Sequence, residues 1–235
     1  MKKICTICAR GGSQGVKNKN IISFLGKPLI AHSILQAKAS NLFNTIAVSS
    51  DSKKILAIAR KWGADCLIKR PDYLASDTAG KLPVIKHAVL EVETKKNVHY
   101  DIIVDLDVTS PLRKIDDVKN AMTYFLQHKK ANNLITGAKA RKSPYFNIVE
   151  IDSVGYATLS KLGEKAVVRR QDAPKCYDLN ASIYIWKRSA LFKNDQVITN
   201  NTIFYEMPEE RSIDIDTPID LLFVRMLARK MKTKL

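Results

Sequence analysis

A basic, glycine-rich loop near the amino end is the first feature of this sequence that could support chemistry. An apolar run over residues 4–9 ends in Arg10, and glycines, lysines and asparagines follow. Glycine tolerates positive φ angles and lets backbone N–H groups approach a ligand, and a nest of N–H groups beside a guanidinium binds anions. The groups that would contact the anion belong to Arg10, Gly11, Gly12, Ser13 and Lys19. The loop predicts a polyphosphate site; the plainer alternative is a glycine turn that happens to be basic.

Two aspartates one residue apart, Asp214 and Asp216, form the sharpest acidic feature. We expect residues 212–216 to be a strand, on which residues i and i+2 face the same side. Two converging carboxylates repel each other unless a cation lies between them, and hard oxygen ligands are those that Mg²⁺ prefers. The pair therefore predicts a Mg²⁺ site. The alternative is that one aspartate caps the helix beginning at Pro218 and the other is solvated.

Asp105 and Asp107 have the same spacing at the end of an earlier expected strand. Three interpretations are open: a second metal pair, an Asp107 carboxylate that contacts a substrate hydroxyl or amide, or two solvated side chains. Thr109, Ser110 and Arg113 follow directly, and we expect them to bring two hydroxyls and a guanidinium to the same edge.

Other catalytic arrangements are not supported by the spacing of residues. The histidines show neither metal-ligand spacing nor a Ser-His-Asp arrangement, and the sequence contains neither a G-x-x-x-x-G-K-[ST] phosphate loop nor a G-x-G-x-x-G fingerprint. Cys5 and Cys8 have C-x-x-C spacing, but residues i and i+3 of a strand face opposite sides and no second Cys/His pair follows. We expect ordinary buried thiols there.

Strand-like and helix-like segments alternate through the first half of the chain, which predicts an α/β fold with a mostly parallel central sheet. Strands are expected at residues 4–9, 44–50, 64–68, 101–106 and 134–138, and helices at 28–39, after a cap at Asp51, at 78–94 and at 115–128. In such sheets ligands bind beyond the carboxyl ends of the strands. The Arg10 loop, Asp105 and Asp107 should therefore share one edge.

The pattern changes after Lys139. Short β-like pieces fall at residues 145–151, 156–159 and 165–168. They predict a hairpin-rich insertion within residues 139–180 of a single domain spanning residues 1–235. A projecting hairpin often supplies a dimer interface, whereas an ordinary β edge of the same sheet fits the pattern equally well. The α/β pattern resumes at residues 181–186 and ends with a helix over residues 218–232.

The composition is that of a globular protein with a strong positive charge. The 235 residues carry a net charge of +16, 46% are hydrophobic, and no apolar run is long enough to span a bilayer. The amino end, Met1-Lys2-Lys3, lacks the apolar stretch of a signal peptide, so we expect a cytoplasmic protein. The charge fits an enzyme with anionic substrates, a nucleic-acid-binding protein or ordinary solvated surface, and the charge alone does not separate these cases. The basic residues are spread along the chain, apart from a tail at residues 225–234, without interleaved aromatic residues, and we expect neither nucleic acid nor a membrane as a partner.

A series of motifs runs through nearly the whole chain. Residues 9–20 read A-R-G-G-S-Q-G-V-K-N-K-N, and further motifs lie at residues 48–51, 69–71, 74–79, 109–113, 180–185 and 212–217. In this order they resemble the acylneuraminate cytidylyltransferases, the CMP-sialic acid synthetases, whose opening loop is A-R-x-x-S-K-G-x-x-x-K-N. Gln14 replaces the usual lysine. The resemblance implies a Rossmann-like nucleotide-sugar transferase fold with helices on both faces of the sheet, and a homodimer in which a projection covers the partner's sugar site.

The same resemblance implies roles for individual residues. The nucleotide-binding set would be Ala9, Arg10, Gly11, Gly12, Ser13, Lys19, Asn20, Arg70 and Asp77. The sugar-binding set would be Asp107, Thr109, Ser110, Arg170 and Asn180, with Arg170 acting in the partner's site. Asp214 and Asp216 would bind Mg²⁺ and, with Arg10 and Lys19 at the triphosphate, would form the catalytic set.

One departure from the family bears on the sugar. Where the sialic-acid enzymes usually carry Leu-Gln-Pro, this chain has Leu106-Asp107-Val108, and an ionised aspartate cannot donate a hydrogen bond. This stretch and residues 174–178 look more like the enzymes that activate legionaminic acid, a bacterial relative with two acylamino groups. In the related KDO-activating enzymes an aspartate near this strand end binds metal, so Asp107 is also a candidate Mg²⁺ ligand.

The reaction implied is nucleotidyl transfer, in which the anomeric hydroxyl of a nine-carbon 2-keto sugar acid attacks the α-phosphate of CTP and pyrophosphate leaves. N-acetylneuraminate, pseudaminate and KDO are the alternative acceptors to legionaminic acid. Two remoter alternatives are a glycosyltransferase using Asp105-Leu106-Asp107 as a D-x-D metal motif, and a basic nucleic-acid-binding protein.

Overall fold

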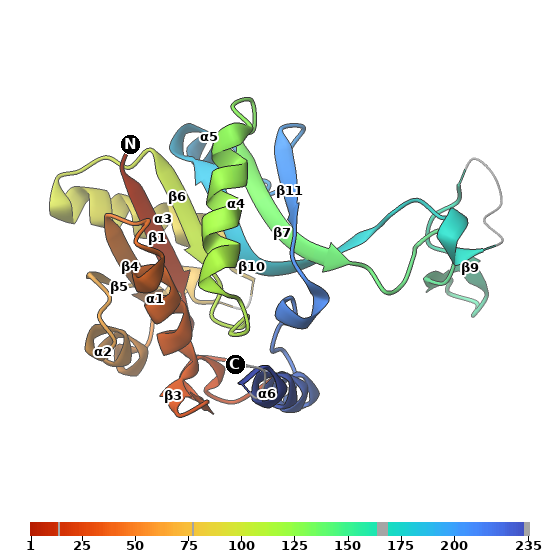
Figure 1. Ribbon diagram of the computed structural model, residues 1–235, viewed down its shortest axis with the longest axis horizontal. Helices are drawn as coiled ribbons and strands as arrows, with labels where there is room; N and C mark the ends of the chain where they lie inside the picture. The colour runs from red at the N-terminus through yellow and green to blue at the C-terminus, as the bar shows by residue number, and fades with distance from the viewer. Residues whose placement is uncertain (14, 77, 164–168, 233–235) are drawn as a thin grey trace.

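A seven-stranded sheet forms the centre of the computed structural model, which describes residues 1–13, 15–76, 78–163 and 169–232 (Figure 1). In spatial order the strands are β11 (Thr202–Glu206), β7 (Asn133–Lys139), β10 (Tyr177–Lys187), β6 (Ile102–Leu106), β1 (Lys3–Cys8), β4 (Thr45–Ser50) and β5 (Cys66–Lys69). β10 is antiparallel to β6 and β7, and the other neighbouring pairs are parallel. The mostly parallel sheet predicted from the sequence is confirmed.

Helices pack into two apolar clusters on opposite faces of this sheet. One cluster contains residues of α1 (Leu29–Ser40), α2 (Lys53–Lys61), α4 (Ile115–Gln127) and α6 (Pro218–Lys232), and the other contains residues of α3 (Lys81–Lys96) and α5 (Arg188–Lys193). Successive strand residues point to opposite faces, so Ile4 enters one cluster and Cys5 the other. A central strand covered on both faces must be apolar throughout, which explains the unbroken run at the amino end.

Several sequence expectations about local structure are wrong. Ser52, and not Asp51, caps α2, because its hydroxyl accepts from the Ile55 N–H at 3.4 Å. Residues 212–216 are not a strand but a connection without regular secondary structure. The strand expected at residues 181–186 is longer than predicted: it is the eleven-residue β10. The sequence predicts neither α5 nor β11.

Short elements complete the chain. β2 (Ser23–Phe24) and β3 (Lys27–Pro28) form a small hairpin ahead of α1, with both residues of its turn, Leu25 and Gly26, at positive φ. Single 3-10 turns occur at η1 (Lys19–Ile21), η2 (Asp72–Leu74), η3 (Arg170–Asp172) and η4 (Glu209–Arg211). None of the described helices is both long and apolar enough to cross a membrane.

An arm leaves the body between β7 and β10, on the right in Figure 1. The ends of these two strands pair antiparallel as they leave, from Lys139 with Tyr177 to Gly137 with Leu179. The arm carries the hairpin of β8 (Val149–Ile151) and β9 (Ala157–Leu159), which confirms a β-rich insertion. The expected β piece at residues 165–168 lies outside the described residues.

Candidate active site

The glycine-rich loop begins where β1 ends. The Ala9 N–H donates to the Ser49 carbonyl at 2.9 Å, which extends the pairing of β1 with β4 by one residue. The loop then turns away, and the Gly11 N–H donates to Asp51 Oδ1 at 2.8 Å. Asp51 thus serves as an anchor for the loop, which explains why it does not cap α2. The Asn20 side chain closes the loop by donating to the Arg10 carbonyl at 2.8 Å.

The loop meets the Asp214–Asp216 segment directly. A Cβ added to Gly15 would lie 2.0 Å from the Asp216 carbonyl oxygen, so only glycine allows this approach. Lys19 Nζ contacts Asp216 Oδ1 at 2.9 Å. A Cβ on Gly12, by contrast, would meet nothing within 4 Å, so the backbone there faces open space. The structure therefore brings the cationic loop from one end of the chain against the aspartates from the other.

Asp214 and Asp216 differ sharply in environment. Ile215 between them is fully buried and its N–H donates to the Thr109 carbonyl at 3.1 Å, which holds the segment against the end of β6. Asp214 Oδ1 is buried without a hydrogen-bond partner among the described residues. Burial, followed by the nearby negative charge of Asp107, raises the pKa of Asp214 to about 6. The Asp216 side chain is 70% exposed.

Neither aspartate is used as a helix cap. The amino end of α6 is closed by Thr217 and Asp220: Asp220 Oδ2 accepts from the Thr217 N–H at 2.7 Å, and Thr217 Oγ1 accepts from the Asp220 N–H at 3.3 Å. This reciprocal arrangement is the capping box of the S/T-x-x-D/E pattern. The capping alternative raised by the sequence is wrong, and both Asp214 and Asp216 keep carboxylate oxygens for another purpose.

These two carboxylates fit a divalent cation by their chemistry. Asp214 has a buried oxygen without a partner among the described residues, and the Asp216 side chain is largely exposed, so both offer hard oxygen ligands. Burial, followed by the charge of Asp107, raises the pKa of Asp214, and a nearby cation would favour its ionised form. Among the described residues there is no group of three or more histidine, cysteine, aspartate or glutamate side chains suited to a metal ion. A Mg²⁺ ion here would complete its shell with water and phosphate oxygens, as Mg²⁺ commonly does.

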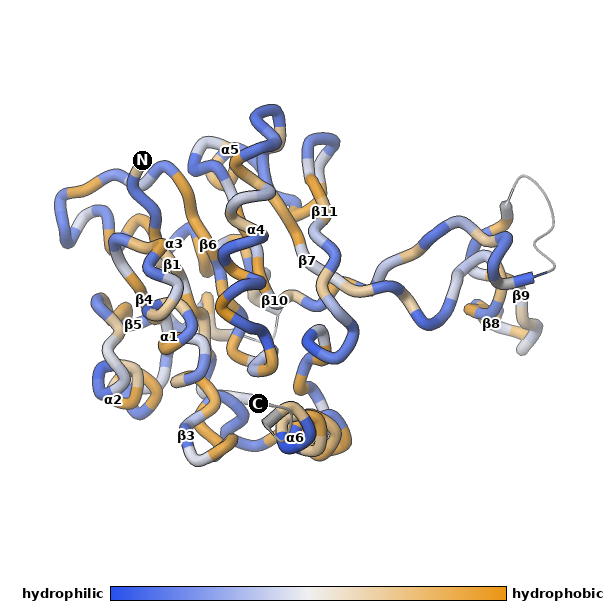
Figure 2. Tube along the Cα trace, viewed as in Figure 1, coloured by the Kyte–Doolittle hydropathy of each residue, from blue (hydrophilic) through white to orange (hydrophobic). Residues whose placement is uncertain are grey.

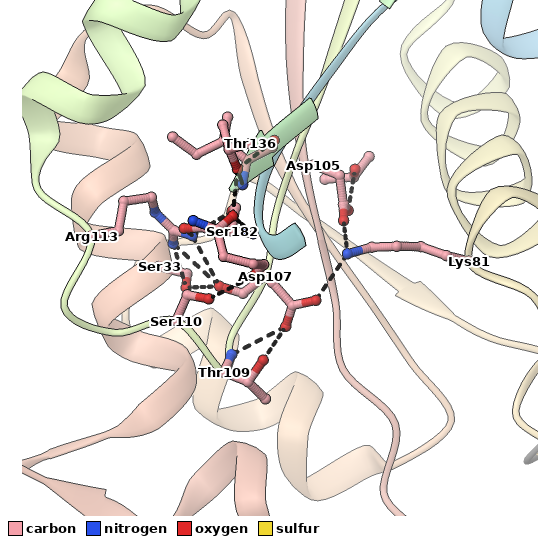
Figure 3. Close-up of polar contacts among 12 residues, drawn as sticks. Ser33, Lys81, Asp105, Asp107, Thr109, Ser110, Arg113, Thr136 and Ser182 are labelled. Carbon is pink, nitrogen blue, oxygen red and sulfur yellow. Dashed lines mark hydrogen bonds and ion pairs between the residues drawn. The ribbon is translucent and has the colours of Figure 1, made fainter. Parts of the chain in front are cut away.

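Asp107 is held by its own chain (Figure 3). Its Oδ1 accepts from the backbone N–H and hydroxyl of Thr109 at 3.1 and 2.8 Å, and its Oδ2 accepts from Lys81 Nζ at 2.9 Å. Lys81 also lies 3.2 Å from Asp105 Oδ2 and sits over the ring of Tyr184. Sequence analysis missed Lys81. Lys81 lies in the first turn of α3 and contacts Asp105 and Asp107 at the end of β6, a relation that only the tertiary structure reveals.

Arg113 does not reach the ligand edge, so that expectation is wrong. Its side chain is buried and donates to the Ser182 carbonyl at 2.6 Å and to Ser33 Oγ at 3.0 Å, as well as to the Asp107 carbonyl (Figure 3). Burial lowers its pKa to about 10. Arg113 therefore ties the 107–113 loop to α1 and β10.

Several residues assigned to nucleotide or sugar are buried in the walls of the site. Arg70 is 4% exposed and donates to the Ser49 carbonyl at 3.0 Å. Ser110 Oγ donates to the Asn180 carbonyl at 3.2 Å, and Asn180 Oδ1 accepts from Thr136 Oγ1 at 2.7 Å beside a bulge in β10. Asp77 lies outside the described residues. Arg170 belongs to η3 on the arm, away from the sheet edge of its own subunit (Figure 1).

The two cysteines of β1 are ordinary thiols. Cys5 is fully buried, and burial, reinforced by the charge of Asp105, raises the pKa of both Cys5 and Cys8. A raised thiol pKa keeps sulfur protonated and unreactive. Cys5 is buried as expected, whereas Cys8 is only partly buried.

A cationic, glycine-rich loop faces a pair of aspartates at the strand ends of an α/β sheet, an arrangement that suits nucleotidyl transfer. The profile of the family described as "Cytidylyltransferase" matches residues 4–232, and this chain belongs to that family.

Relatives and solved structures agree with this assignment. The chain is 45% identical over 227 residues to post-translational flagellin modification protein B of Campylobacter coli, spanning 97% of this chain and 95% of that protein. It is also 45% identical over 224 residues to CMP-N,N'-diacetyllegionaminic acid synthase of Campylobacter jejuni, spanning 95% and 94%. The structure of CMP:2-keto-3-deoxy-manno-octonic acid synthetase complexed with CTP superposes with a TM-score of 0.69 at 19% identity, covering 98% of this chain and 100% of that one. The expected nucleotide-sugar transferase fold is confirmed.

Proposed function

We propose that this cytidylyltransferase transfers CMP from CTP to the anomeric hydroxyl of a nine-carbon 2-keto sugar acid of the legionaminic type, and releases pyrophosphate. The observation that carries the proposal is the contact between the glycine-rich loop and the Asp214–Asp216 segment, made by Lys19 and by the close approach of Gly15. The relative named CMP-N,N'-diacetyllegionaminic acid synthase, at 45% identity along nearly its full length, supports the choice of sugar. CTP as the donor fits a cytoplasmic reaction.

In this mechanism the loop binds the phosphates. Arg10, Lys19 and the backbone around Gly12, which faces open space, would stabilise the charge that builds up on the departing pyrophosphate. Phosphoryl-type transfer depends on positioning and on charge neutralisation more than on covalent chemistry by the protein. The basic loop supplies both, because its backbone is fixed by Ser49 and Asp51 while its cations remain at the edge.

The carboxylates complete the site. Asp214 and Asp216 would hold Mg²⁺, which when bound would neutralise phosphate charge and favour deprotonation of the anomeric hydroxyl. Asp216 would leave Lys19 for the metal, and Lys19 would then be available to a phosphate. Asp107, which already accepts three hydrogen bonds from Thr109 and Lys81 and has one acceptor position left on Oδ2, is assigned to the sugar and not to the metal.

The D-x-D glycosyltransferase alternative fits this arrangement poorly. Asp105 and Asp107 both contact the ammonium group of Lys81, so their charge is compensated within the chain. A metal ion at this pair would have to displace a lysine that is three-quarters buried.

A panel of sugar acids tests the proposal. N-acetylneuraminic, N,N'-diacetyllegionaminic, pseudaminic and KDO acids are each incubated with CTP and Mg²⁺, and pyrophosphate release is measured. The highest kcat/KM is expected with the legionaminic acid. Pyrophosphate release with none of the four would contradict the proposed function, and a preference for another acid would correct the sugar.

We also propose that the working enzyme is a homodimer. Large apolar side chains are exposed on the arm, at Val149, Ile151 and Tyr156, and along one side of α6, at Ile219, Leu222 and Met226. Figure 2 shows that the β8–β9 hairpin and α6 lie on separate parts of the molecule. A second copy can cover both in a reciprocal, isologous interface. In that arrangement the arm, with Arg170, would reach the partner's sugar site.

Light scattering after gel filtration tests the dimer. The chain has a mass of 26.4 kDa, so a dimer should give twice this value. Ile151→Asp in the arm should produce monomers with reduced activity, whereas Leu90→Asp, at an exposed apolar residue of α3, should remain dimeric. A monomeric wild-type enzyme with full activity would contradict the proposal.

A further inference from the structure

Asp107 is held at the edge of the sheet through both its main chain and its side chain. Its backbone N–H donates to the Ser182 carbonyl at 3.2 Å, and its carbonyl accepts from Ser33 Oγ at 2.9 Å and from the Arg113 guanidinium. The carboxylate is oriented separately, by Thr109 on one oxygen and Lys81 on the other. Main chain and side chain are thus both fixed before any substrate binds.

The hydrogen bonds leave one oxygen of Asp107 incompletely used. A carboxylate offers about four lone-pair positions, two on each oxygen. Thr109 occupies both positions on Oδ1 with two donors, and Lys81 occupies one on Oδ2. The side chain is 24% exposed. Under the proposed function, the remaining position on Oδ2 would accept from a ligand hydroxyl or amide.

Lys81 is built to keep that carboxylate in place and charged. Its ammonium group lies 2.9 Å from Asp107 and 3.2 Å from Asp105, and the ring of Tyr184 lies beneath it at 4.5 Å. Asp105 is almost fully buried, and its other oxygen accepts from Thr6 Oγ1 at 2.8 Å. The lysine therefore bridges a buried, immobile carboxylate and a partly exposed one.

Lys81 also offsets negative charge at this edge of the sheet. Asp105, Asp107, Asp214 and Asp216 bring four carboxylates to the place where, under the proposed function, an anionic sugar acid must bind. Lys19 compensates Asp216, and Lys81 is the cation in contact with Asp105 and Asp107. Without Lys81, two uncompensated carboxylates would repel the carboxylate of the substrate.

We infer that Lys81 is a positioning residue for sugar-acid recognition: it fixes Asp107 as an ionised acceptor for a hydroxyl or acylamino N–H of the sugar and offsets the negative charge of the subsite. This inference rests on the proposed function and adds to it a residue on α3, outside the motif that carries Asp107. Lys81 acts through Asp107 and does not contact the reacting atoms.

Steady-state kinetics with Lys81→Met test the inference. The KM for the sugar acid should rise about 10-fold to 100-fold, the cost of losing one charge-assisted hydrogen bond in binding, while the KM for CTP should stay within about twofold. Lys81→Arg retains the charge and should keep the sugar KM within about fivefold of wild type. Equal rises in both KM values, or an unchanged sugar KM, would overturn the inference.

Lys86→Met is the matched control. Lys86 lies on the same helix and also makes a lysine–aspartate contact, at 3.0 Å to Asp195, but on a surface away from the strand ends. Its replacement should leave both KM values unchanged. A rise in the sugar KM with Lys86→Met as large as that with Lys81→Met would assign the effect to α3 in general and contradict the inference.

The double variant separates positioning from mere proximity. Asp107→Asn alone should raise the sugar KM. The sugar KM of Lys81→Met/Asp107→Asn should be at most about twofold above that of the single variant with the higher sugar KM, because both changes remove the same contact. Multiplicative effects would overturn the inference. If Lys81→Met does not fold, Asp107→Asn and Lys81→Arg carry the test by the same split between the two KM values. If the wild-type enzyme turned over none of the sugar acids, that result would instead contradict the proposed function itself.

Discussion

Two lysine–aspartate pairs stand at the same edge of the sheet with the same 2.9 Å separation, and they differ in the environment of the aspartate. Lys19 reaches from the glycine-rich loop to Asp216, whose side chain is 70% exposed. Lys81 reaches from α3 to Asp107, whose side chain is 24% exposed and receives two further hydrogen bonds from Thr109. Exposed ion pairs contribute little to stability and exchange partners readily, whereas buried pairs are costly to break.

The difference assigns the two pairs to different tasks. Lys19 and Asp216 pair with each other in the free protein, and under the proposed function both would become available when phosphate and a metal ion bind. Lys81 and Asp107 would remain together and would give the sugar side a fixed shape and charge. A transferase that binds two anionic substrates and releases pyrophosphate would then have an exchangeable ion pair, Lys19–Asp216, on the phosphate side and a fixed ion pair, Lys81–Asp107, on the sugar side.

Removal of divalent metal should have the largest effect. With excess EDTA, turnover of CTP and the sugar acid should fall by at least about 10³, since metal stabilisation of transferring phosphates accounts for several kcal/mol. The melting temperature without substrates should not change, because Lys19 compensates Asp216 in the absence of metal. Activity is measured by pyrophosphate release and stability by calorimetry, and Mg²⁺ should restore the rate. Full turnover in EDTA would exclude the metal assignment.

Asp216→Asn should come next in magnitude. We expect kcat to fall about 10²-fold to 10³-fold, as for the loss of one preorganised charge at a transition state, with a wild-type circular dichroism spectrum. Arg10→Ala should behave alike. Asp195→Asn is the control, because Asp195 is the exposed partner of a lysine distant from the site. Near-normal kcat for Asp216→Asn would show that the exchangeable pair has no catalytic task.

The contrast between the pairs could be read only partly from the sequence. The parallel sheet, the loop after β1 and the aspartates near Pro218 follow from local patterns, since strand–helix alternation and glycine spacing are short-range signals. Lys81 does not, because its meaning depends on where α3 begins relative to β6, a relation between segments far apart in the chain. Nothing in the pattern of residues 78–94 distinguishes Lys81 from Lys86, the other lysine of this segment, as the one that faces the strand end.

Arg113 and the 212–216 segment illustrate the same limit. An arginine after a strand end looks like an anion ligand, but its side chain turns inward to Ser33 and Ser182, which come from two other elements. The segment around Ile215 alternates like a strand, yet one hydrogen bond to the Thr109 carbonyl takes the place of a ladder. In both cases tertiary partners decide the outcome, and the local pattern does not contain them.

Lys81→Met should separate the pairs by stability. Removing the lysine leaves Asp105 buried and uncompensated beside Asp107, and we expect the free energy of unfolding to fall by about 3 kcal/mol. Lys86→Met, which frees an exposed aspartate, should cost less than about 1 kcal/mol. Urea denaturation followed by circular dichroism measures both. Equal losses for the two variants would mean that the buried pair is no more firmly built than a surface one.

Lys19→Met should have the smallest effect on stability and therefore completes the comparison. Its partner Asp216 stays hydrated when the lysine is lost, so the free energy of unfolding should fall by less than about 1 kcal/mol. The kcat should nevertheless fall about 10²-fold, because the same ammonium group is assigned to the phosphates during transfer. Lys19→Arg should keep part of the rate. A loss of stability as large as that of Lys81→Met, or an unchanged kcat, would contradict the division between an exchangeable pair and a fixed one.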